Sequence, residues 1–156
     1  MFLLAACGSD HPKSWKDQPL ETVTGAVDGH AYSIDLPKGV QKSKYSEEWQ
    51  WHDAGYVFPP SVSLYWHAKK QTLDEALAGD IDKTDAIEKT PRADGFTFVK
   101  PVPDKKHPTY AITSVTYAGD AAIECHALLW DLHTDDAGVK AEIPLVEKMC
   151  ASLKVK

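Results

Sequence analysis

The chain has 156 residues, of which 43% are hydrophobic and 26% are charged, so it is large enough for one globular domain and too apolar for wholesale disorder. Its formal net charge of −6 disfavours nucleic acid as a partner. No run of apolar residues approaches the roughly 20 that a membrane-spanning helix needs. Three cysteines exclude a disulfide-dense mini-protein and a zinc site built from paired Cys-x-x-Cys motifs.

The N-terminal segment resembles the end of a bacterial lipoprotein signal peptide. Leu4-Ala5-Ala6-Cys7 matches a lipobox, in which a leucine and two small residues precede the cysteine that becomes lipidated. The resemblance implies that residues 1–6 are a signal-peptide remnant and that Cys7 carries lipid. Residues 7–20 would then be a tether to a single domain at 21–156. The alternative is a plain apolar N-terminus with a chance cysteine.

A lipidated cysteine implies a location in the bacterial cell envelope, with the domain facing the periplasm. Each buried acyl CH₂ contributes about 0.8 kcal/mol, so two or more chains form a stable membrane anchor. In the class that the segment resembles, an Asp directly after the cysteine often retains the protein at the inner membrane. Gly8 stands at that position, so the resemblance favours the outer membrane.

The first half of the chain predicts strands. Residues 22–27 and 32–36 are strand-like and are separated by Asp28-Gly29, which is a strong hairpin signal. Alternation of apolar and polar residues predicts two more strands at 48–52 and 61–68.

A capped helix is expected after these strands. Thr72-Leu73-Asp74-Glu75 fits a capping box, and Gly79 is a plausible C-terminal stop. The pattern at 81–89 is ambiguous and ends at Pro91. Residues 95–99 then predict a strand, and the proline-rich segment 101–108 predicts a loop.

The longest predicted strands are 110–117 and 121–132, and a helix closes the chain. Apolar residues on both faces of the second strand indicate a central position in a sheet. Helical spacing from Ile143 to Leu153 predicts the helix, with Pro144 in its first turn. The order of elements predicts an α+β fold, an antiparallel sheet with helices packed on its faces.

Cys125 and Cys150 are expected to form a disulfide. Both face the core in their predicted elements, and an exported protein meets an oxidising compartment. The bond would close a loop of about 25 residues, which contributes on the order of 3 kcal/mol. The alternative is a redox-active pair, which the absence of Cys-x-x-Cys spacing disfavours.

Several segments together resemble the PsbP-like fold, which includes the Mog-type Ran-binding protein. These are Tyr32-Ser33-Ile34-Asp35-Leu36-Pro37-Lys38-Gly39, the capped helix, the paired long strands and a final helix ending Ala151-Ser152-Leu153-Lys154. The sequence departs from the pattern at Val40, where an aromatic residue often follows the glycine. The resemblance implies an α+β sandwich that serves as a protein-binding or accessory module. It implies no catalytic residue and no cofactor, because the family shares no catalytic set.

Aromatic residues form a candidate binding surface. Trp49 and Trp51 project from one face of a strand, and Tyr56 and Trp66 extend the surface. Such a platform suits a glycan, for example peptidoglycan, or a proline-rich partner. The alternative is that these rings pack in the core.

A metal site at His126, Asp131 and His133 is a weaker hypothesis, because strand alternation does not bring the three together. Solvated histidines at a strand end are the simpler interpretation. We therefore expect a lipid-anchored envelope protein with a non-catalytic binding or accessory domain, acting with an envelope protein partner. The alternatives are a glycan-binding protein and a metal-dependent enzyme.

Overall fold

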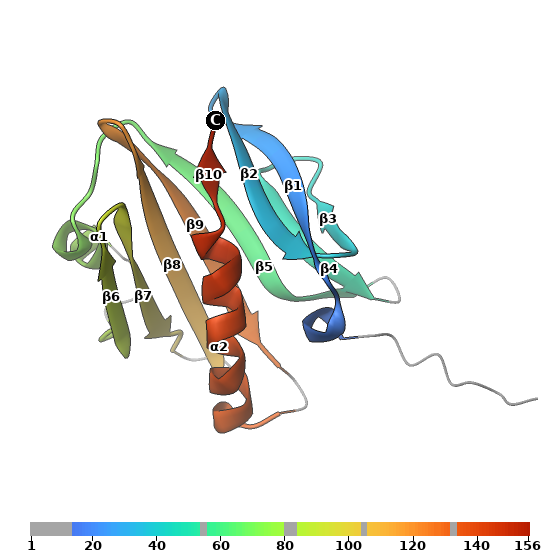
Figure 1. Ribbon diagram of the computed structural model, residues 1–156. Helices are drawn as coiled ribbons and strands as arrows, with labels where there is room; N and C mark the ends of the chain where they lie inside the picture. The colour runs from blue at the N-terminus through green and yellow to red at the C-terminus, as the bar shows by residue number, and fades with distance from the viewer. Residues whose placement is uncertain (1–13, 54–55, 80–83, 104–105, 132–133) are drawn as a thin grey trace, which may run out of the picture.

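The computed structural model describes residues 14–53, 56–79, 84–103, 106–131 and 134–156, with the backbone alone for residues 52, 53 and 56–59. Cys7 and His133 lie outside these residues. Within them, the strands form two antiparallel sheets, and most of the regular structure is sheet (Figure 1). The expected antiparallel sheet with helices packed on it is therefore found. The strands divide into two sheets, because the first hairpin pairs with the C-terminal strand and not with the larger sheet.

The elements follow the chain in a simple order. The strands are β1 (Leu20–Val27), β2 (His30–Pro37), β3 (Val40–Lys42), β4 (Glu48–Asp53), β5 (Tyr56–His67), β6 (Glu88–Arg92), β7 (Gly95–Pro101), β8 (Thr109–Ala118), β9 (Ala121–Trp130) and β10 (Lys154–Val155). The helices are a 3-10 turn η1 (Trp15–Asp17), α1 (Leu73–Gly79) and α2 (Asp136–Ala151).

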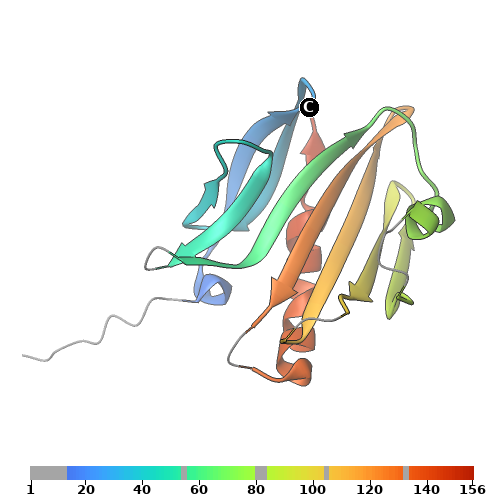
Figure 2. The ribbon, with the colours of Figure 1, turned by 180° about the vertical axis from the view of Figure 1, so that it is seen from behind.

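The larger sheet has the strand order β3-β4-β5-β9-β8-β7-β6 (Figure 2). The prediction that 121–132 contains a central strand is confirmed, because β9 pairs with β5 on one side and β8 on the other. Cys125 lies opposite Leu64 and Ser114 in this register. Successive residues of each strand point to opposite faces of this sheet, and the two faces are covered by different elements.

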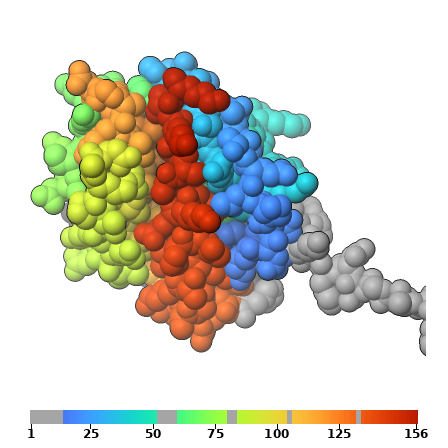
Figure 3. Space-filling model, viewed as in Figure 1, coloured from blue at the N-terminus to red at the C-terminus, as the bar shows by residue number. Residues whose placement is uncertain are grey.

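One face of this sheet is covered by α2 and by the small sheet, whose order is β1-β2-β10. In the space-filling view, α2 runs between the β6–β7 hairpin and the β1–β2 hairpin (Figure 3). The side chains between these layers form the main core. Among those at most 1% exposed are Tyr32, Ile34, Leu36, Ile112, Ile123, Leu129 and Met149.

The opposite face carries α1, which packs Leu73 and Leu77 on a second cluster with Phe96 and Phe98. The predicted capping box is present: the Thr72 amide donates to Glu75 Oε2 at 2.7 Å, and the Glu75 amide donates to Thr72 Oγ1 at 3.2 Å. The Thr72 amide, together with the Thr72 hydroxyl, which donates to Glu75 Oε2 at 3.0 Å, lowers the pKa of the Glu75 carboxyl. The short helix therefore starts where local chemistry predicts.

The predicted hairpin and disulfide are confirmed. Asp28 and Gly29 both have positive φ, 48° and 82°, as a two-residue primed turn requires. Cys125 and Cys150 are bonded, with Cα atoms 5.5 Å apart, and both are completely buried between β9 and α2. The disulfide thus links the centre of the large sheet to the last turn of the closing helix.

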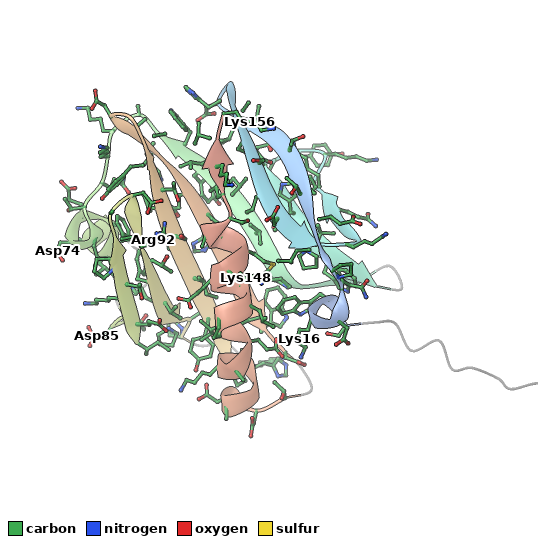
Figure 4. The ribbon with its side chains drawn as sticks, in the orientation of Figure 1. Lys16, Asp74, Asp85, Arg92, Lys148 and Lys156 are labelled. Carbon is green, nitrogen blue, oxygen red and sulfur yellow. A yellow bond between two sulfur atoms is a disulfide. The ribbon has the colours of Figure 1, made fainter. Side chains whose placement is uncertain are left out.

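Two boundaries differ from expectation. Pro144 lies in the middle of α2, where its missing N–H costs about 3 kcal/mol, and not in the first turn. Packing of Val139, Ile143 and Val146 on the sheets offsets that cost. Within the segment 7–20, which the sequence analysis interprets as a tether, Trp15 is only 7% exposed and belongs to the core. Lys16 of η1 forms an ion pair with Glu142 of α2. Lys16 is labelled beside α2 in Figure 4.

Three strands were not predicted. β6 includes Pro91, which is tolerated because β6 is an edge strand of the large sheet. β3 and β10 have only three and two residues, too few for a recognisable alternation. No helix in the described ranges is long and apolar enough to cross a membrane.

Candidate functional site

A groove of about 580 Å³ opens where the end of β1 approaches the segment 42–47 and the end of β5. We call it the aromatic groove; residues 26–28, 42–47 and 64–66 line it. Its position follows from the sheet topology. β4 begins only at Glu48, opposite Ser63, so the last residues of β5 have no neighbouring strand on that side. The segment 42–47 lies there instead.

Backbone hydrogen bonds hold this segment at both ends. The amide of Ser43 donates to the carbonyl of Glu48 at 2.7 Å, and the amide of Leu64 donates to the carbonyl of Glu47 at 2.9 Å. Between them, the amide of Tyr45 donates to Ser43 Oγ at 3.2 Å. The backbone of this groove wall is therefore held against the large sheet.

The buried Tyr32 also holds this wall, through a hydrogen bond to Glu47. The Tyr32 hydroxyl donates to Glu47 Oε2 at 2.7 Å and accepts from Trp49 Nε1 at 3.0 Å. Glu47 Oε1 pairs with Lys42 Nζ at 2.6 Å. Burial, and then the hydrogen bond to Glu47, raise the pKa of the Tyr32 hydroxyl. The hydroxyl therefore keeps its proton and remains the donor to Glu47 at physiological pH. The close approach requires Gly25, because a Cβ there would lie 2.4 Å from the Tyr32 oxygen.

Three aromatic side chains contribute to the groove. Tyr45 is 96% exposed and Tyr65 is 49% exposed. The half-buried Trp66 stacks on the exposed ring of His30, with centroids 3.7 Å apart and planes at 11°. Tyrosine offers a rigid apolar ring with a polar end, which suits a contact surface that is open to water.

The charges in the groove cancel. Lys42 and Glu47 neutralise each other, and the remaining ionisable groups are Lys44 and Asp28. Neither of these two has an ion-pair partner among the described residues. Two ammonium groups and two carboxylates leave a net charge of zero, so the groove selects neither a polyanion nor a polycation.

Of the predicted surface of Trp49, Trp51, Tyr56 and Trp66, the structure describes three side chains. Trp49 is 9% exposed and lies in the core, and Trp51 packs against the core beside Gly39. The alternative of core packing therefore holds for Trp49. The Tyr56 side chain lies outside the described residues. Of these three described side chains, Trp66 lines the aromatic groove, together with Tyr45 and Tyr65.

A second recess of about 300 Å³ lies on the opposite face of the large sheet, beside α1. We call it the histidine cleft; it contains His67 of β5, Glu124 and His126 of β9, and Thr113 of β8. His67 Nε2 lies 2.7 Å from Glu124 Oε2. His126 Nδ1 lies 3.1 Å from Thr113 Oγ1 and 4.0 Å from Glu124 Oε1.

This cleft does not reproduce the geometry of a hydrolytic triad. A carboxylate in a triad orients one nitrogen of the imidazole while the other nitrogen activates the hydroxyl. Here the same nitrogen of His126 faces both Thr113 and Glu124. In the described part of the chain, no group of three or more His, Cys, Asp or Glu side chains is arranged to hold a metal ion.

The described residues do not form the metal site considered for His126, Asp131 and His133. His126 points into the histidine cleft, with Glu124 and Thr113 as its neighbours. Asp131 follows the end of β9, and His133 lies outside the described residues. The pair of Glu124 and His126 was open to prediction, since both residues lie on the polar face of one strand.

Sequence reasoning missed Tyr45 and Tyr65. Tyr65 lies between the apolar positions Leu64 and Trp66, so alternation alone placed it on the opposite face of β5. Tyr45 lies in a segment without periodicity.

No protein-family model matches the chain, and a search of curated proteins finds no match either.

Proposed function

We propose that this chain is a lipid-anchored protein of the bacterial cell envelope whose domain is a non-catalytic binding or accessory module. Lipid on Cys7 would hold it at the membrane, with the outer membrane favoured by Gly8. The observation that carries the proposal is the buried Cys125–Cys150 disulfide together with the lipobox-like Leu4-Ala5-Ala6-Cys7. Structural disulfides persist in oxidising compartments, so both features point to export.

The aromatic groove supports the binding part of the proposal. Exposed tyrosines on a wall held by backbone hydrogen bonds, with polar side chains beside them, are typical of a surface that contacts a ligand. As an accessory module, the domain would bind a protein partner in the cell envelope.

We also propose that the fold is a PsbP-like sandwich. The segments that carried the resemblance form regular elements, which supports the proposal: residues 32–39 lie in β2 and the turn after it, and α1 is the capped helix. The long strands are the β8–β9 hairpin, and α2 closes the domain. Superposition of an experimental structure on PsbP-like domains tests this, and a different strand order in the large sheet would refute it.

The anchor is tested by mass spectrometry of the product that a bacterium makes from the full-length gene. We expect a mass increase for an acylated Cys7 and recovery in the outer-membrane fraction. Cys7→Ser, the matched control, should lack the acyl mass and should not be recovered in the outer-membrane fraction. An unmodified Cys7 thiol in the wild-type product, or a cytosolic pool of folded protein, would refute the proposal.

Cross-linking in intact cells then identifies the partner, and Tyr45→Ala separates contacts made by the aromatic groove from others.

A further inference from the structure

We infer that the aromatic groove binds an uncharged, hydroxyl-rich sugar chain, with the rings of Tyr45 and Tyr65 as its contact surfaces. The inference rests on the proposed function, because it takes the groove as the ligand site of the binding module. It differs from the platform expected from sequence, since neither Trp49 nor Trp51 takes part.

The first step concerns the exposed rings. Tyr45 is almost fully exposed although its segment is fixed by hydrogen bonds at Ser43 and Glu47. A single exposed aromatic residue is unremarkable, but Tyr45, Tyr65 and Trp66 line one recess. Tyrosine rings lose little conformational entropy on binding, which is why they are common in recognition surfaces. The arrangement thus offers a ligand flat apolar contact areas on a backbone that is held in place.

The second step concerns the polar groups between the rings. Hydroxyls of Ser43 and Ser46, the ammonium of Lys44 and the carboxylate of Asp28 line the same groove. A pyranose ring presents an apolar face of C–H groups and an edge of hydroxyls that both donate and accept. The alternation of rings with donors and acceptors in the groove therefore matches a sugar along both its faces and its edges.

The third step concerns charge. The two lysines and two acidic residues of the groove cancel, and the whole chain carries −6. A nucleic acid, which would also stack on aromatic rings, needs a positively charged track along its backbone. A proline-rich peptide would use the rings and offer carbonyl acceptors, but its prolines have no N–H to donate to Asp28. An uncharged glycan satisfies both the rings and the polar groups.

The test is isothermal titration calorimetry of the full chain. One titration uses tetra-N-acetylchitotetraose as the probe, and a separate titration uses a proline decapeptide to represent the other class of ligand. We expect saturable binding of the sugar. Tyr45→Ala should weaken it by about tenfold, which corresponds to 1.4 kcal/mol. Ile87→Ala is the matched control, because Ile87 is also an exposed large apolar residue and lies outside the groove. Its affinity should equal that of the wild type, and thermal unfolding should show that both variants are folded.

Each contrary outcome has a distinct meaning. No saturable binding of the sugar at millimolar concentration would overturn the inference. Binding of the decapeptide that Tyr45→Ala abolishes would keep the groove as the site of a binding module and overturn the glycan class. Sugar binding that Tyr45→Ala leaves unchanged would place the glycan elsewhere and overturn the assignment to this groove. The lipid on Cys7 is measured separately, so none of these results decides the anchor.

Discussion

Removing the Cys125–Cys150 disulfide should destabilise the domain by about 3.5 kcal/mol. The bond closes a loop with a sequence separation of 25, and the chain-entropy relation for a loop of that length yields this magnitude. For a domain of this size the loss lowers Tm by roughly 10 °C. With a urea m-value of about 2 kcal/mol/M, the unfolding midpoint falls by between about 1.5 and 2 M.

The assay is urea unfolding of Cys7→Ser protein in its oxidised and reduced forms, with the double variant Cys125→Ala/Cys150→Ala beside them. The reduced form isolates the cross-link, because both sulfur atoms remain in the core. The double variant should be less stable still, since it also loses buried volume. Identical midpoints for the oxidised and reduced forms would refute the entropy argument. Two free thiols in the folded oxidised protein would refute the bond itself.

Three further substitutions test other parts of the structure. Gly95→Ala should destabilise the protein by more than about 1 kcal/mol in urea unfolding, because φ is 152° and a Cβ would lie 1.9 Å from the Val115 carbonyl oxygen. Glu147→Gln should raise the urea midpoint at pH 7 and leave it unchanged at pH 4. Burial, and then the negative charge of Glu88, raise the pKa of the Glu147 carboxyl above its ordinary value of 4.5, so the stability of the wild type falls as pH rises through the folded-state pKa. Trp15→Ala should cost about 3 to 5 kcal/mol by the same assay, because its ring is part of the main core.

Each of these substitutions has a control within the same chain. Gly79→Ala should be nearly neutral, since nothing lies within 4 Å of the added Cβ; an equal loss for Gly95→Ala and Gly79→Ala would contradict the steric argument. Glu88→Gln should shift the pH dependence in the same direction as Glu147→Gln. A Glu147→Gln midpoint raised equally at pH 4 and pH 7 would show that charge is not the cause. If Trp15→Ala unfolds like the wild type, then residues 14–20 are a tether after all.

Elements set by neighbouring residues were predictable. The capping box depends on hydrogen bonds between Thr72 and Glu75, and the Asp28-Gly29 turn depends on two positive φ angles. The disulfide was also within reach, because strand periodicity placed Cys125 on the core face and helix periodicity placed Cys150 toward it. Interactions over three or four residues, and periodic burial, are encoded in the local order of the chain.

The site was not predictable in the same way. Tyr45 and Tyr65 are 20 positions apart in the chain, and they share a groove only because β4 begins no earlier than Glu48, opposite Ser63. The midhelix place of Pro144 and the burial of Trp15 likewise depend on packing between layers. Short-range hydrogen bonding and periodicity therefore set the turns, the caps and the disulfide in advance. The groove and the division into two sheets arise only when distant segments meet, since burial and strand pairing are properties of the whole fold.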